Sequence, residues 1–121
     1  MPVQRLSKKA LQQILAGETI APATCIVKFY SNTCPMCHNL REYYEEVSEK
    51  DTYADLHFFA FNVDDYPNVE KLLNFNGTPS IFAIRTGSRK PKIRALPDPD
   101  TPHEHTWYRV KDINNFIEKE R

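Results

Sequence analysis

Apolar residues follow two different spacings along this chain, and the spacings alternate. Residues 24–30 (Thr-Cys-Ile-Val-Lys-Phe-Tyr) and 56–63 are almost continuously apolar, β-branched or aromatic, which is typical of strands covered on both faces of a sheet. Residues 40–47 instead carry apolar side chains at helical spacing, and Pro67 is placed to open a short second helix. The pattern predicts a β-α-β-α order in the middle of the chain.

Both flanks of this segment also contain periodic elements. Ser7 precedes apolar residues at helical spacing and Gly17 follows them, which predicts a capped amphipathic helix. Residues 80–84 and 92–96 have strand character and flank Thr86-Gly87-Ser88-Arg89, so we expect an antiparallel hairpin with a tight turn. Apolar residues recur at helical spacing over 110–117 and predict a terminal helix.

The segment between the hairpin and the terminal helix is rich in proline. Pro97, Pro99 and Pro102 deny it both helical and central-strand geometry. We therefore expect an exposed loop at about residues 97–106. Since no repeat or second boundary is visible, the chain is predicted to be one domain over residues 1–121.

Composition and charge narrow the classes of function. The chain has 121 residues, 40% of them hydrophobic, and 16 basic residues balance 16 acidic ones. This apolar content excludes a disordered chain. A balanced charge leaves no basic excess for binding nucleic acid and no polybasic run for a membrane surface. A monomer is the default expectation, because no dimer seam is visible.

Cysteine usage and the N-terminal residues bear on the cellular compartment. No apolar run long enough for a signal-peptide core follows the basic residues near the start of the chain. Scattered thiols stay reduced inside cells, where a close cysteine pair is more often catalytic or metal-binding than structural. We therefore expect a cytoplasmic protein.

The chemistry of the sequence is concentrated in Cys34-Pro35-Met36-Cys37, at the junction of a predicted strand and a predicted helix. Free amides and the helix dipole at a helix N-terminus stabilise the thiolate of the first cysteine. Cys34 is then able to attack a disulfide, and Cys37, one turn deeper, is placed to resolve the mixed disulfide. The spacing predicts a redox-active dithiol.

The pattern as a whole resembles the thioredoxin family over about residues 24–96. The specific marks are Phe29-Tyr30 ahead of the Cys34–Cys37 motif, Asn62-Val63-Asp64 leading to Pro67, and Gly77-Thr78-Pro79 before a strand. The resemblance implies an α/β thioredoxin fold, with a central mixed β-sheet flanked by helices on both faces. It also implies thiol–disulfide oxidoreductase activity on protein disulfides, and hence a role in electron transport and cell redox homeostasis.

Further expectations follow from the resemblance alone. The Thr78-Pro79 peptide bond should be cis, and Thr78 with Pro79 should form a substrate-binding wall facing the cysteines. The implied partners are disulfide-containing protein substrates and a reductase or other dithiol electron donor. No organic cofactor or metal is expected, because electrons pass between dithiols.

The motif also departs from the family pattern. Thr33 replaces the usual tryptophan, and Pro35-Met36 replaces Gly-Pro in the active-site loop. Lys28 stands where many thioredoxins bury an aspartate. A cation there would favour the thiolate, so Lys28 and His38 are candidates for tuning the pKa of the thiols. The alternative for Lys28 is a side chain that snorkels outward from the strand edge.

Other interpretations of the motif remain open. Cys34 to His38 also spells the c-type haem attachment pattern, and Cys34, Cys37, His103 and His105 have the ligand types of a zinc site. Glutathione binding, as in glutaredoxins, is weakened because the expected Gly-Gly pair is missing. A redox-inactive protein-binding module on the same fold is the alternative from a different class of function.

Several other residues have plainer expected roles. Cys25, Trp107 and Tyr108 are predicted to pack in the core. Asp64 and Asp65 are expected to cap a helix and contact solvent.

Overall fold

The computed structural model describes residues 3–121, and over this part of the chain it contains five strands, four α-helices and two short 3-10 helices. The predicted start of the domain at residue 1 lies outside the described residues. In chain order the elements are β1 (Val3–Arg5), α1 (Lys8–Leu15), β2 (Thr24–Tyr30), α2 (Pro35–Ser48), η1 (Asp51–Tyr53), β3 (His57–Asn62), η2 (Val63–Asp65), α3 (Val69–Leu73), β4 (Ser80–Arg85), β5 (Lys92–Ala95) and α4 (Val110–Glu120).

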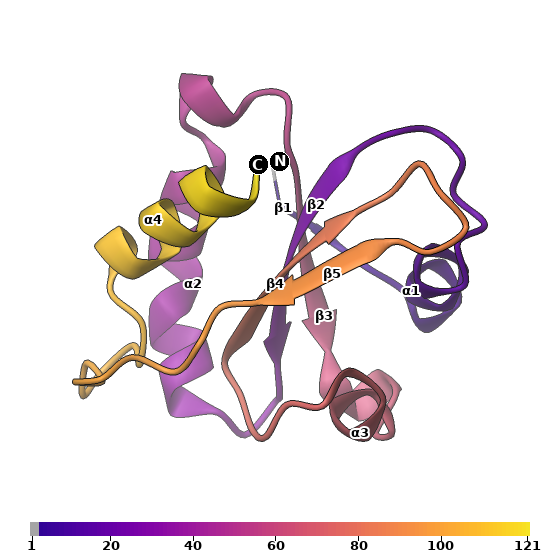
Figure 1. The fold of residues 1–121 in the computed structure, drawn as a ribbon. Coiled ribbons are helices and arrows are strands. Elements are labelled where there is room, and N and C mark those ends of the chain that lie inside the picture. The colour runs from indigo at the N-terminus through magenta and orange to yellow at the C-terminus, as the bar shows by residue number, and fades with distance from the viewer. Residues whose placement is uncertain (1–2) are drawn as a thin grey trace.

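The strands form one mixed sheet in the order β1-β3-β2-β4-β5 (Figure 1). β3 runs parallel to both β1 and β2, whereas β4 runs antiparallel to β2 and to β5. β2 is therefore a central strand, and Lys28 in its middle pairs with Ala60 on one side and Ile81 on the other. The predicted fold class, a mixed sheet with helices on both faces, is confirmed.

Helices cover the two faces of this sheet in pairs. α2 and α4 lie over one face, and α1 and α3 lie over the other (Figure 1). Successive side chains of β2 alternate between the two cores because strand side chains have a period of two. Ile26 packs in the core beneath α2 and α4, whereas Cys25, Val27 and Phe29 pack in the core beneath α1 and α3.

The predicted helix boundaries have local causes that the structure shows. The Ser7 side chain accepts a hydrogen bond from the Ala10 amide and caps α1. Gly17 ends the α1 turn with a φ of +76°, and a Cβ there would collide with the Arg89 carbonyl oxygen. Only glycine tolerates both that conformation and that approach. Pro35 occupies the first turn of α2, where its missing N–H has no partner to lose.

Two features of the sheet differ from the prediction. β1 was not predicted, because a three-residue strand is too short for a hydrophobic period to be visible. The β4–β5 connection was predicted to be a tight turn but runs over residues 86–91. Thr86 explains the longer path, since it is buried and its hydroxyl donates to the Ala21 carbonyl at 2.8 Å. The connection is anchored to the segment after α1 rather than folded on itself.

The proline-rich segment is largely exposed, as predicted, but its far end is ordered by the core. His103 and Trp107 exchange backbone hydrogen bonds of 3.0 and 2.9 Å. Tyr108 is buried beneath the last helix, and Trp107 packs partly buried against the same core. The predicted core positions of Cys25, Trp107 and Tyr108 agree with the structure. None of the helices over residues 3–121 combines the length and hydropathy of a membrane span.

Candidate active site

Cys34 and Cys37 are joined by a disulfide at the start of α2. Cys34 is the N-cap residue, and its sulfur accepts a hydrogen bond of 3.0 Å from the Cys37 amide. Cys34 is half-buried, whereas Cys37 is only 3% exposed. The start of α2 thus places the more accessible sulfur, that of Cys34, first and the covered sulfur of Cys37 one turn deeper, as predicted.

The loop before β4 lies against this pair. The Thr78-Pro79 peptide bond is cis, as the resemblance implied. The Thr78 carbonyl oxygen lies 3.6 Å from the Cys34 sulfur, and Pro79 is buried. Gly77 approaches with a φ of +84°, and its amide donates to a Glu70 carboxylate oxygen at 3.0 Å. The structure therefore brings together the two segments that the sequence assigned to one site.

The remaining residues of the motif differ in exposure. Pro35 and His38 are exposed, and Met36 is partly buried. Pro35 and Met36 thus form the surface of the helix start beside Cys34, while His38 extends from the second turn toward the rim of two hollows described below. Their predicted roles in recognition and in tuning the thiols stay predictions.

Lys28 does not snorkel outward, so that expectation is wrong. β2 is flanked by strands on both sides, and Lys28 in its middle is 4% exposed. Its Nζ lies 5.1 Å from the ring centroid of Tyr44 on α2 and 5.9 Å from that of Tyr30. Burial lowers the pKa of Lys28 from its ordinary value of 10.5 to about 8, with Glu45 opposing this shift and Arg41 adding to it.

A cavity of about 480 Å³ places Lys28 and the cysteine pair in one chamber. We call it the cysteine cavity. Its wall comes from β1, β2, the loop before α2, α2 itself and β3. The members that carry charge or titrate are Arg5, Lys28, Tyr30, Cys34, Cys37, His38, Arg41, Tyr44 and Glu45. Its charged members are mainly basic, with Arg5, Lys28 and Arg41 against Glu45.

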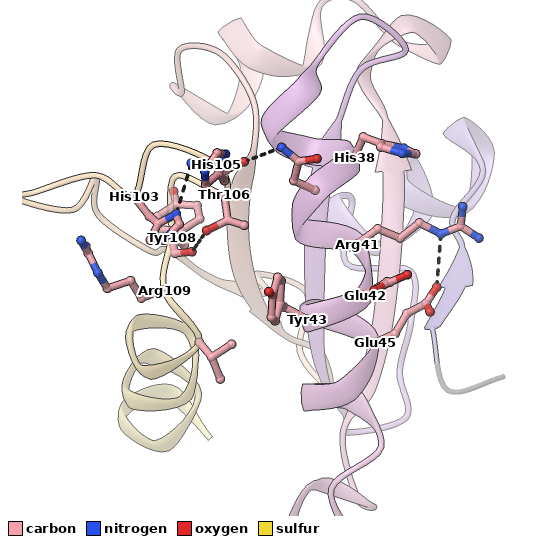
Figure 2. A pocket seen from close by; sticks show the side chains of 12 residues that line it. His38, Arg41, Glu42, Tyr43, Glu45, His103, His105, Thr106, Tyr108 and Arg109 are labelled. Carbon is pink, nitrogen blue, oxygen red and sulfur yellow. Dashed lines mark hydrogen bonds and ion pairs between the residues drawn. The ribbon is translucent and has the colours of Figure 1, made fainter.

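A second hollow, of about 860 Å³, lies between α2 and the proline-rich loop (Figure 2). We call it the loop groove. His103 and His105 lie on its loop side, and Asn39 of α2 donates to the His105 carbonyl at 2.9 Å. Tyr43 extends into it from α2 (Figure 2). The groove shares His38, Arg41 and Glu45 with the wall of the cysteine cavity.

The zinc alternative is not supported by this arrangement. Both cysteine sulfurs are bonded to each other, and His103 accepts a hydrogen bond from the His105 amide through its Nδ1. Over residues 3–121, no group of three or more His, Cys, Asp or Glu residues is arranged to hold a metal ion. The two histidines belong to the loop groove.

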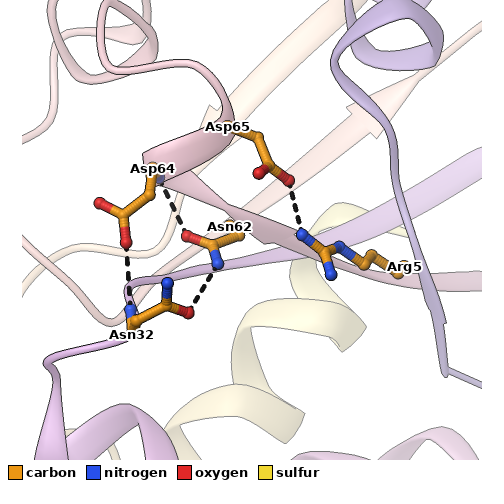
Figure 3. Close-up of polar contacts among 5 residues, drawn as sticks. All are labelled: Arg5, Asn32, Asn62, Asp64 and Asp65. Atoms are coloured by element: carbon orange, nitrogen blue, oxygen red, sulfur yellow. Dashed lines mark hydrogen bonds and ion pairs between the residues drawn. The ribbon is translucent and has the colours of Figure 1, made fainter.

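A polar network fixes the loop that leads into Cys34 (Figure 3). Asn62, at the end of β3 and 4% exposed, donates from its amide nitrogen to the Asn32 side chain at 2.9 Å and accepts from the Asp64 amide at 2.9 Å. Asp64 accepts from the Asn32 amide at 3.3 Å, and Asp65 pairs with Arg5 at 2.8 Å. The expected capping role of the two aspartates is wrong, since Asn62 is the cap of η2.

Sequence reasoning missed two supporting residues. Asn62 was noted only as part of a motif, although a polar residue ending a covered strand signals a hydrogen-bonded position. Tyr44 lies in the stretch 40–47 whose apolar residues predict a helix, yet its hydroxyl is buried between the carbonyl oxygens of Ile26 and Phe59, at 3.0 and 2.8 Å. Burial raises the pKa of Tyr44 well above its ordinary value. A buried tyrosine needs such acceptors, but their location is not visible in the sequence.

Comparison with known proteins agrees with this geometry. The family model described as Thioredoxin matches residues 2–100. The structure is similar to that of reduced Schistosoma mansoni thioredoxin pre-protein, with a TM-score of 0.70 and 19% identity over 100% of both chains. It is also similar to a Malassezia sympodialis thioredoxin, with a TM-score of 0.67 and 14% identity over 99% of this chain and 94% of the other.

A further similar structure is the J-Trx1 fragment of ERdj5, with a TM-score of 0.66 and 19% identity. The match covers 98% of this chain but 49% of that fragment, so this chain spans about half of its length. At these identities the structural similarities show the fold.

Proposed function

We propose that this chain, which belongs to the thioredoxin family, is a thiol–disulfide oxidoreductase that reduces protein disulfides through Cys34 and Cys37. The observation that carries the proposal is the paired sulfurs at the start of α2, one accessible and one covered, bonded to each other and facing the Thr78-Pro79 loop. A cytoplasmic location belongs to the same proposal.

The geometry suits a two-step exchange. In the dithiol form, the amide of Cys37 and the N-terminus of α2 stabilise a thiolate on Cys34. That thiolate attacks one sulfur of the substrate disulfide and forms a mixed disulfide, releasing the other substrate sulfur as a thiolate. Cys37 then attacks Cys34, which forms the bond seen in the structure and releases the second substrate sulfur. The substrate gains two electrons and the dithiol loses them.

The partners follow from this exchange. The exposed start of α2 and the adjacent Thr78 carbonyl offer an extended substrate chain a binding wall beside Cys34. A dithiol donor must then reduce the Cys34–Cys37 bond before the next turnover. The electrons move between sulfur atoms throughout, so these steps call on neither an organic cofactor nor a metal.

Two serine variants test the proposal. We expect Cys34→Ser to lose turnover with a protein disulfide, because the attacking sulfur is removed. Cys37→Ser should accumulate mixed disulfides between Cys34 and the substrate, because the resolving sulfur is removed. Mass spectrometry under non-reducing conditions detects them. Unchanged turnover in Cys34→Ser would exclude the proposed chemistry.

A redox-inactive binding module is the second candidate, and the loop groove favours it. The groove is larger than the cysteine cavity and is framed by the proline-rich segment. A binding module would keep its affinity for its partner in both serine variants, whereas an oxidoreductase would lose turnover in the first and trap its substrate in the second.

A further inference from the structure

The charge of the chain balances as a whole, but the β4–β5 hairpin is locally basic. Residues 85–94 contain five basic residues and no acidic one. All five are exposed, and over residues 3–121 none of them takes part in an ion pair. We call this surface the basic edge, and its members are Arg85, Arg89, Lys90, Lys92 and Arg94. Such a local excess of cations favours a partner that carries negative charge.

Three of these cations lie on one face of the sheet. Lys92 pairs directly with Arg85, and Arg94 pairs with Ala83. Cross-strand partners share a face and strand side chains have a period of two, so Arg85, Lys92 and Arg94 point to the same side. They line a shallow recess beside Glu120 that, at about 10 Å³, is too small for a small-molecule ligand. Like charges directly opposite each other destabilise a sheet, and acidic groups placed over them would remove this cost.

β5 also presents an unpaired backbone edge, because it is the outermost strand of the sheet (Figure 1). The Leu96 amide donates to the Ile81 carbonyl at 2.8 Å. In an antiparallel ladder every second residue directs its amide to the partner strand, so the amide of Arg94 also points toward β4. The amides of Ile93 and Ala95 therefore point outward. An extended chain beside β5 is able to pair with them.

The segment after α1 holds the hairpin in place. The Thr86 hydroxyl donates to the carbonyl oxygens of Ala21 and Ala23, at 2.8 and 3.3 Å. The Gly87 amide donates to the Thr19 carbonyl at 3.4 Å. The basic edge is thus pre-organised, and little conformational entropy is lost from it when a partner binds.

The basic edge lies away from the cysteine pair. Arg85 pairs with Thr24 at the start of β2, whereas Cys34 and α2 follow the end of β2. The hairpin connection and the start of α2 are therefore at opposite ends of the sheet (Figure 1). A partner bound at the basic edge leaves Cys34 accessible.

These observations favour a polypeptide over other anionic partners. Residues 85–95 include no aromatic side chain on which a nucleic-acid base could stack. Neither a nucleic acid nor a lipid headgroup pairs with alternate amides and carbonyls along a strand, whereas an extended peptide does. A second copy of this chain, paired through its own β5, would bring like charges together. An acidic segment of a different protein matches both the charge and the backbone edge.

We propose that the basic edge binds an extended acidic segment of a partner protein, which adds to the sheet as a strand beside β5. Alternating acidic and apolar side chains fit this edge. The acidic ones lie across from Lys92 and Arg94, and the apolar ones lie beside Ile93, which packs against the core beneath α1 and α3. The docked chain donates to the Ile93 carbonyl in place of Arg94 Nη1, which does so at 3.2 Å in the free protein. The Arg94 guanidinium then pairs with an acidic group.

Peptide binding to the full chain tests this proposal. A fluorescein-labelled peptide, Glu-Val-Glu-Val-Glu-Val, is titrated with the protein, and its fluorescence anisotropy is followed at low and high salt. We expect binding that weakens with salt and is at least about tenfold tighter than that of Glu-Glu-Glu-Val-Val-Val, which has the same composition without the alternation. Equal affinities for the two peptides would overturn the proposed strand pairing.

Two variants separate the charge from the backbone edge. Lys92→Glu should weaken binding about tenfold, whereas Lys9→Glu makes the same change at an exposed position on α1 and should leave binding unchanged. Ile93→Pro keeps every charge but removes an outward amide, so it should weaken binding about as much as Lys92→Glu. Full binding by either Lys92→Glu or Ile93→Pro would overturn the proposal.

Hydrogen exchange in the wild-type protein gives a test that does not depend on a variant. Saturating Glu-Val-Glu-Val-Glu-Val should slow exchange of the Ile93 and Ala95 amides at least about tenfold, as followed by NMR. The Arg94 amide should be affected less, because it already pairs with β4. Binding without this protection would overturn the proposal. Tighter binding of an oligothymidylate, or of vesicles of equal parts phosphatidylcholine and phosphatidylserine, than of the peptide would also overturn it.

This inference goes beyond the proposed function and is tested independently of it. The peptides contain no cysteine, so their binding involves no exchange of sulfur. Cys34→Ser should therefore bind the peptide like the wild type, and Lys92→Glu should exchange with a small disulfide like the wild type. Loss of peptide binding in Cys34→Ser would contradict the separation of the two surfaces.

Discussion

The cysteine cavity and the loop groove share α2 as a wall, yet they are built in different ways. The cysteine cavity is the smaller, and it contains a buried cation, a covered sulfur and residues of the central strand. The loop groove is the larger, and its α2 side is formed mostly by exposed polar residues that face the end of the proline-rich segment (Figure 2). The smaller chamber contains Lys28, whose pKa is lowered by burial, together with the covered sulfur of Cys37.

This contrast shows that the volume of a hollow does not by itself indicate where the candidate active-site residues lie in this fold. A group held away from water on a rigid strand has its proton affinity set by the protein. A group on an exposed loop keeps the properties that it has in solution. Substitutions of the buried residues around the cysteine cavity should therefore have large effects, and substitutions of exposed residues at either hollow should have small ones.

The largest predicted effect on stability belongs to Lys28→Met. The unfolded chain holds the Lys28 proton up to pH 10.5, whereas the folded protein releases it at about pH 8. The folded protein therefore bears the full penalty of the buried charge below pH 8, and the penalty falls as the pH rises from 8 to 10.5. We expect the variant to be more stable than the wild type by roughly 3 kcal/mol at pH 7, as measured by urea denaturation.

The pH dependence of this difference is the sharper part of the prediction. The stability advantage of Lys28→Met should shrink above pH 8 and vanish above about pH 10.5, where Lys28 is neutral in both states. Lys50→Met, at an exposed position, should show no such trend. A difference that stays constant across this range would show that Lys28 is not desolvated.

Asn62→Ala comes next in size. The variant loses two buried hydrogen bonds, to the Asn32 side chain and to the Asp64 amide, and with them the cap of η2. We expect it to lower the free energy of unfolding by about 1–2 kcal/mol. Asn68→Ala is the matched control, because Asn68 also precedes a helix but makes no capping hydrogen bond. Equal losses in the two variants would contradict the role of the network in Figure 3.

The ion pair between Arg5 and Asp65 should matter less, although it joins the same network. The Arg5 side chain is 63% exposed, and ion pairs between exposed side chains contribute little to stability because water and salt screen them. We expect Arg5→Ala to change the free energy of unfolding much less than Asn62→Ala does, and to lose this effect at high salt. If Arg5→Ala lowered the free energy of unfolding as much as Asn62→Ala does, the Arg5–Asp65 ion pair would be as important to stability as the hydrogen bonds of Asn62.

The smallest effects are expected in the loop groove. Tyr43 and His105 are exposed and lie across the groove from each other. Tyr43→Ala and His105→Ala should each change the rate of exchange with a small disulfide less than about twofold. A large loss of this rate would show that the groove takes part in the chemistry, whereas a loss seen only with a protein partner would favour a docking role.

The sequence predicts the architecture well because most of its signals are local. Ser7, Gly17 and Pro35 mark helix ends through their own backbone chemistry, and the apolar run over 24–30 identifies a central strand. β1 is not predicted, because three residues are too few for a repeat of hydrophobic positions to be recognised. The strand forms because β3 offers it a parallel partner.

The residues of the candidate site also differ in whether a local signal in the sequence identifies them. Cys34 and Cys37 are readable from their spacing, and Thr78-Pro79 from the resemblance to the thioredoxin family. The burial of Lys28 is a tertiary property, because a lysine on a strand snorkels at an edge and is trapped at the centre. Only the strand order decides between these outcomes. The contacts of Tyr44 and Asn62 likewise join residues 15 to 30 positions apart.

The redox equilibrium of Cys34 and Cys37 tests the central claim most directly. The protein is equilibrated across glutathione buffers, the free thiols are alkylated, and the oxidised fraction is counted by mass. We predict a reversible two-electron transition at a potential within the range of about −270 to −120 mV that dithiol oxidoreductases span. An absence of the intramolecular disulfide at every glutathione ratio would contradict the proposed function.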